Sequence, residues 1–152
     1  MEISPTDARR KLSWLEQSCK QITNIEGIRL IEVRDPLKDR MQGFNCFVYL
    51  YGIGNSLPFR VIDDLVLITV RKSAIEVPTP QAGDIAVYLG KESESETSEA
   101  KEQKHVGRIT TNGQVLSKWG YGHVYEHRID LVPECYGSEV RFFREQQKDS
   151  TI

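Results

Sequence analysis

Apolar residues recur at helical spacing between Leu12 and Ile22, with intervals of three and four positions. This period is typical of a helix with one face against the core, and Cys19 lies on that face. Ser4 and Pro5 precede the pattern, as a cap and a proline in the first turn commonly do. We therefore expect an N-terminal helix with Cys19 toward the core.

Two shorter apolar patterns follow. Residues 27–35 alternate as in a short strand, which Pro36 would end. A second apolar run begins at Cys46, and its periodicity fits either a helix or a buried strand. The preceding Asn45 is a good N-cap, so a short helix is favoured, with Cys46 near its start. A further helix, without a clear end, is expected within residues 57–78.

The second half of the chain has the period of strands. Asn112-Gly113, a strong hairpin signal, joins two β-rich runs. Helices followed by a meander of antiparallel strands define the α+β class, with the helix of Cys46 packed across the sheet. The predicted strands cover residues 84–89, 105–110, 114–119 and 138–144.

Residues 91–104 contain no large apolar side chain and are rich in charged residues. Such a segment cannot contribute to a core, so we expect a flexible acidic insertion between two strands. A length of 152 residues fits one domain. The sequence thus predicts a single domain over 1–152.

The composition excludes several classes of protein. A net charge of −2 gives no electrostatic case for nucleic acid or an anionic membrane. No apolar run is long enough for a bilayer span or a secretory signal. Three scattered cysteines argue against a disulfide framework. We expect a reducing, cytoplasmic setting, although specialised secretion and the oligomeric state stay open.

The segment from His123 to His127 matches the H-x-x-E-H pattern of inverted zinc peptidases. That chemistry needs both histidines on one helix, whereas Val124 and Tyr125 favour extended structure. We therefore expect no metal here, and no organic cofactor is implied.

A different chemistry is indicated by Cys46 with His105. A thiol nucleophile needs a base to accept its proton and a third group to orient the imidazole. The start of a helix favours the thiolate, and its N–H groups can receive a developing oxyanion. Cys46 directly after Asn45 suits that arrangement, and the Asn45 side chain could support the oxyanion.

The order of these motifs resembles the NlpC-type and CHAP-type branch of the papain-like cysteine peptidases and amidases. In that branch a Gly-Asp strand follows the cysteine helix and precedes the strand that begins with the catalytic histidine. The matching segments here are Gly83 to Tyr88 and His105 to Gly107. The chain also looks like a group of uncharacterised bacterial domains with further short motifs. Their counterparts are Asn45-Cys46, Ser117 to Gly120, Glu126-His127 and Tyr136 to Arg144.

The resemblance covers roughly residues 43–144, which hold the core motifs, and it implies a papain-like fold with Cys46 as nucleophile and His105 as base. It places the third group twelve positions after the histidine, at Ser117, with Lys118 and His127 as further candidates for support. The register of the hairpin decides which of these candidates lies on the same face of the sheet as His105. A two-residue turn would place Lys118 on the face of His105, whereas a three-residue loop would place Ser117 there.

The expected reaction is thiol attack on an amide or ester carbonyl, giving an acyl-enzyme that water or another nucleophile resolves. The expected partner is a peptide or another amide-containing substrate. Two alternatives remain open at this point. One is a catalytically lapsed binding module of the same fold, and the other is an effector or toxin domain with deamidase or acyltransferase chemistry.

Overall fold

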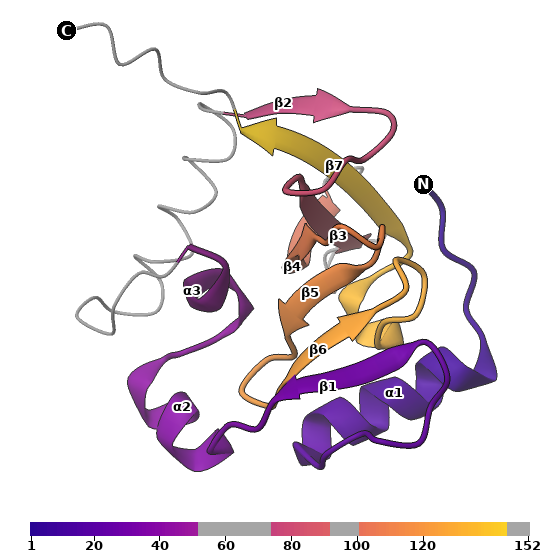
Figure 1. Cartoon of the computed structure of the whole chain (residues 1–152). Coiled ribbons are helices and arrows are strands. Elements are labelled where there is room, and N and C mark those ends of the chain that lie inside the picture. Colours follow the sequence, from indigo (N-terminus) through magenta and orange to yellow (C-terminus); the bar gives the residue numbers. More distant parts are fainter. Residues whose placement is uncertain (52–73, 92–100, 146–152) are drawn as a thin grey trace, which may run out of the picture.

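The chain forms a seven-stranded antiparallel sheet with helices on both faces, so the predicted α+β class is confirmed (Figure 1). The computed structural model describes residues 1–51, 74–91 and 101–145. The strand order is β1-β6-β5-β4-β3-β7-β2. The strands are β1 (Ile28–Glu32), β2 (Ala74–Val77), β3 (Ile85–Lys91), β4 (Lys101–Ile109), β5 (Val115–Lys118), β6 (Val124–His127) and β7 (Glu139–Glu145).

Helix α1 (Asp7–Ser18) is the predicted N-terminal helix, but its cap differs from the expected one. The hydroxyl of Thr6, not of Ser4, accepts the backbone N–H of the first turn. Cys19 ends the helix in the left-handed region, with φ 54°, and it is only half-buried. Its expected place in the core is wrong because the helix stops there and the chain turns away.

Helix α2 (Pro36–Gln42) was not predicted, because Pro36 was interpreted only as the end of a strand. Proline also suits the first turn of a helix, where its missing N–H costs nothing. Asp35 caps this helix by accepting the backbone N–H of Lys38 at 3.2 Å. The helix matters for the site because it carries Asp39.

Helix α3 (Cys46–Tyr51) begins at the predicted residue. The carbonyl of Asn45 accepts the backbone N–H of Tyr49 at 3.0 Å, which is the first helical bond. As predicted, α3 packs across the sheet, on β4 and β5.

The described residues differ from two predictions, the helix within 57–78 and the acidic insertion over 91–104. The helix expected within 57–78 lies mostly outside the described residues, and its last part forms strand β2 instead. The acidic insertion expected over 91–104 is shorter, because β3 includes Lys91 and β4 already begins at Lys101. Residues 92–100 lie outside the described ranges.

The hairpin between β4 and β5 has the three-residue loop. Ile109 pairs with Val115, and the backbone N–H of Thr110 donates to the carbonyl of Gln114 at 2.9 Å. Gly113 takes φ 72°, which closes the loop in the left-handed region. Of the two registers considered, this is the one that places Ser117 on the face of His105.

The sheet separates two apolar clusters. We call the side packed against α1 and the short 3-10 helix η1 (Glu134–Tyr136) the α1 face, and the opposite side the α3 face (Figure 1). Successive side chains of a strand point to opposite faces. In β3, accordingly, Tyr88 belongs to the α1 face and Val87 to the α3 face. No helix within the described ranges is long and apolar enough to span a bilayer.

Candidate functional site

Cys46 lies at the start of α3 and packs on the α3 face. It is buried, with 5% of its surface exposed, in a cluster with Phe47, Val87 and Val106. An apolar setting of this kind suits a packing cysteine, so burial alone does not assign a role to the thiol. Lys118 interacts electrostatically with both Cys46 and Cys19, but burial and Glu16 raise the pKa of Cys19 above its ordinary value.

A buried ion network lies next to α3 and joins three elements of the fold. The ammonium group of Lys118, at the end of β5, lies 3.0 Å from the Asp39 carboxylate of α2. It also donates to the carbonyls of Gly120 and Gly122, each at 2.9 Å. Arg34 binds both oxygens of Asp39, at 2.9 and 3.0 Å. We call these three side chains the Asp39 network.

The three side chains of the Asp39 network sum to one positive charge, but Arg34 also pairs with the carboxylate of Glu32 at 3.5 Å, so the cluster that includes Glu32 is neutral. All three ammonium protons of Lys118 have acceptors, which holds this side chain as a cation although none of it is exposed. Burial would raise the pKa of Asp39, but hydrogen bonds from Arg34 and Lys118 hold it below the ordinary value. The ring of Phe44 covers the network, 4.6 Å from the guanidinium of Arg34.

Lys118 and Cys46 interact electrostatically. Burial lowers the pKa of Lys118, the Asp39 carboxylate opposes this shift, and the Cys46 thiol opposes it further. Coupling between two titrating sites is reciprocal. The charge of Lys118 therefore favours the thiolate of Cys46.

His105 projects to the α1 face. Its ring is fully buried and stacks on Tyr136, with centroids 4.1 Å apart and planes 8° apart. Among residues 1–51, 74–91 and 101–145, neither ring nitrogen has a hydrogen-bond partner. Burial lowers the pKa of His105 well below its ordinary value, and His127 lowers it further, so the ring is neutral at neutral pH.

The structure does not bring Cys46 and His105 into hydrogen-bond contact. Val106, the next residue along β4, packs with Cys46, and strand alternation turns His105 to the other face. The sequence identifies the cysteine helix and the histidine strand but not the face that the helix covers. The base role expected for His105 stays a prediction, and this geometry does not support it.

Ser117 shares the face of His105 but bonds to His127. The Ser117 hydroxyl lies 2.9 Å from Nε2 of His127, whose Nδ1 lies 2.7 Å from the carbonyl of Arg128. A carbonyl only accepts, so Nδ1 carries the proton and Nε2 accepts the serine hydroxyl. The indole of Trp119 donates to Ser117 at 3.1 Å. Ser117 and His127 thus bond to each other and to neighbouring core groups, and Ser117 does not orient His105.

The segment with the zinc-peptidase pattern is extended, as Val124 and Tyr125 predicted. His123 precedes β6, and its ring bridges the backbone N–H of Arg34 and the carbonyl of Cys19, at 2.9 and 3.1 Å. Within the described part of the chain, no three potential metal ligands gather.

Sequence reasoning missed Asp39, which pairs with Lys118, and the contact of Tyr136 with His105. Asp39 could have been found from Asp35-Pro36, a capped helix start that would have placed α2 correctly. Tyr136 was noted only as part of a terminal motif, because nothing in the sequence indicates its stacking on His105.

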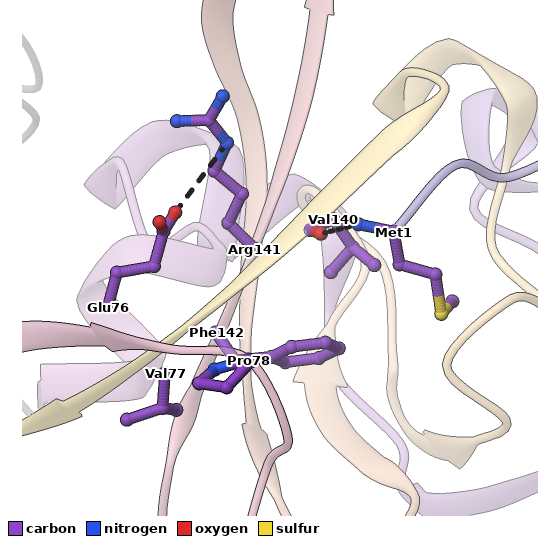
Figure 2. Close-up of a pocket in the computed structure, with 7 residues that line it drawn as sticks. All are labelled: Met1, Glu76, Val77, Pro78, Val140, Arg141 and Phe142. Atoms are coloured by element: carbon purple, nitrogen blue, oxygen red, sulfur yellow. Dashed lines mark hydrogen bonds and ion pairs between the residues drawn. The ribbon is translucent and has the colours of Figure 1, made fainter.

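A pocket of about 520 Å³ opens elsewhere, between β2 and β7 (Figure 2). The amino group of Met1 donates to the carbonyl of Val140 beside it, and Arg141 pairs with Glu76 at 3.7 Å. None of the predicted site residues lines this pocket, so it is separate from the candidate site. The lining residues are Met1, Glu76, Val77, Pro78, Val140, Arg141 and Phe142.

Comparisons with protein-family models, with curated proteins and with solved structures give no match to this chain. The candidate site is therefore defined by its own geometry: a buried thiol at the start of α3, coupled to the buried ammonium group of Lys118.

Proposed function

We propose that the chain is a papain-like cysteine hydrolase in which Cys46 is the nucleophile and Lys118 stabilises its thiolate. The observation that carries this proposal is the buried ammonium of Lys118, held as a cation and coupled to the Cys46 thiol. The position of Cys46 at the start of a helix packed on an antiparallel sheet adds support.

In this proposal the charge of Lys118 replaces the proton transfer expected from His105. A thiolate that is already ionised attacks without a base. With an ester substrate, the Cys46 sulfur bonds to the carbonyl carbon, and the alkoxide leaves and takes a proton from water. A water molecule then attacks the thioester, which releases the carboxylic acid and returns the thiol. Amides follow the same course but need a proton on the leaving nitrogen.

The test is acylation by p-nitrophenyl acetate, an activated ester. We expect a burst of p-nitrophenolate and an acetyl group on Cys46, located by peptide mass spectrometry. Cys46→Ala should lose the burst, whereas Cys19→Ala, which removes the half-buried cysteine at the end of α1, should keep it. Acetylation of Cys135 alone, the exposed cysteine, would contradict the proposal.

A second function, a binding module without catalysis, is favoured by one specific observation. The ring nitrogens of His105 make no hydrogen bond to Cys46, which packs with Val106 on the other face of the sheet, and the Ser117 hydroxyl bonds to His127 instead of orienting His105. A native protein whose Cys46 accepts no acetyl group would support this second function. Fold alone does not decide between the two.

A further inference from the structure

Exposed apolar side chains concentrate at β1 and the helix that follows it. Of the seven large apolar side chains that are exposed within residues 1–51, 74–91 and 101–145, four lie between positions 31 and 41. They are Ile31, Val33, Leu37 and Met41. β1 is also the last strand of the sheet, so no strand in the described part of the chain pairs with its outer edge (Figure 1). An unpaired strand edge beside exposed apolar residues is a template for pairing with another chain.

A β-bulge in β1 changes which side chains share a face. Arg29 lies opposite Glu126 of β6. Glu32 lies opposite Val124, two positions from Glu126, and Tyr125 between them belongs to the α1 face. Residues two apart in a regular strand share a face, and so do residues that lie opposite each other. Arg29 and Glu32 therefore share the α3 face, although regular alternation would separate residues that are three positions apart.

Both charged side chains have room for a second partner. The Arg29 side chain is 69% exposed and pairs with Glu126 at 2.8 Å. The Glu32 side chain is 46% exposed and pairs with Arg34 at 3.5 Å. Bulges and charges commonly protect a strand edge from pairing. Here the bulge instead places opposite charges on one face of the same edge, which makes this edge complementary to itself in one register.

We propose that β1 pairs antiparallel with β1 of a second copy of this chain, about a twofold axis between Leu30 and Ile31. In this register Arg29 lies opposite Glu32 of the second copy, and the axis repeats the pair. The register also places Ile31 opposite Leu30 of the second copy and covers Val33, just beyond β1. Two seven-stranded sheets then join into one continuous sheet through a closed, isologous interface.

The charges favour a second copy over an unrelated strand. Across the interface the sign of the charge alternates. Glu126 and Arg29 lie on one side, and Glu32 and Arg34 of the second copy lie on the other. An unrelated strand would need the reversed charge pattern, whereas a second copy supplies it by symmetry.

The test is the monomer–dimer equilibrium, measured by sedimentation equilibrium from about 1 µM to about 1 mM. Wild type should dimerise in this range. Arg29→Glu and Glu32→Arg, each alone, should weaken the dimer at least about 100-fold, because each places two like-charge pairs across the axis. An equimolar mixture of the two variants should dimerise again, since both mixed pairs have opposite signs. Arg141→Glu, the matched control, reverses an exposed arginine of β7 that also pairs with carboxylates of its own chain, and it should dimerise as wild type does.

A second measurement does not depend on charge. Arg29→Cys and Glu32→Cys are made in a Cys135→Ser background, which removes the exposed native thiol, and are mixed and mildly oxidised. Opposite residues of antiparallel strands are close enough for a disulfide, so one should join the two variants, and neither variant should link to itself. Wild type that stays monomeric, a dimer that survives both charge reversals, or disulfides between identical variants would overturn the inference.

Discussion

Lys118→Met should destabilise the protein strongly, because it leaves a buried carboxylate and two carbonyls without their ammonium donor. Removing one partner of a buried ion pair typically costs about 3–5 kcal/mol. Asp39 keeps both hydrogen bonds from Arg34, so we expect the free energy of unfolding to fall by about 3 kcal/mol, the lower end of that range. Methionine fills much of the space of the lysine stem, which limits the contribution of lost packing.

The assay is urea unfolding at pH 7, read as the change in free energy of unfolding. Arg128→Met is the matched control, because it breaks an ion pair with Asp130 whose side chains are 60% and 48% exposed. It should cost about 0.5 kcal/mol or less. Asp39→Asn and the double variant with Lys118→Met complete a cycle, with an expected coupling of about 1–3 kcal/mol. A loss below about 1 kcal/mol in Lys118→Met would refute the idea that Lys118 is held as a buried cation.

Two further predictions concern pH and backbone conformation. Burial lowers the pKa of His127 to about 4 from 6.5, so its contribution is complete above pH 6.5 and is lost as the pH falls toward 4. Urea unfolding should show a loss of at least about 2 kcal/mol between pH 7.5 and 5, and a flat response would contradict the buried neutral ring. Gly137→Ala should cost at least about 3 kcal/mol, against about 1 kcal/mol for Gly113→Ala, whose added methyl group meets open space. Equal losses by urea unfolding would show that Gly137 does not pack against Leu89.

Much of the sheet could be predicted from local patterns. The alternation of apolar residues predicted β3. The Asn112-Gly113 turn predicted β4, β5 and the connection between them. The edge strand β1 was correctly predicted within residues 27–35, but it was not assigned to the sheet, and the edge strand β2 was expected as part of a helix. Both edge strands are held by pairing with strands that are distant in the sequence, β1 with β6 and β2 with β7. A local sequence pattern does not show which distant strand a segment will pair with.

The candidate site could be predicted only in part. The cap at Asn45 correctly placed Cys46 at a helix start, because capping is a local property. Whether His105 faces that helix depends on which side of the sheet α3 covers, and either side is compatible with the same alternation. The partners of Lys118 depend on α2, whose start at Pro36 was misread as the end of a strand.

The most direct test of the central claim is the pH dependence of Cys46 alkylation in native protein, followed at each cysteine by mass spectrometry. If the Asp39 network stabilises the thiolate, Lys118→Met should slow alkylation at pH 7 by about tenfold and move the profile to higher pH. Asp39→Asn should move the profile the opposite way, although both variants lose stability. His105→Phe should leave the profile unchanged. A profile that shifts with His105→Phe but not with Lys118→Met would contradict the account and restore the histidine as the base.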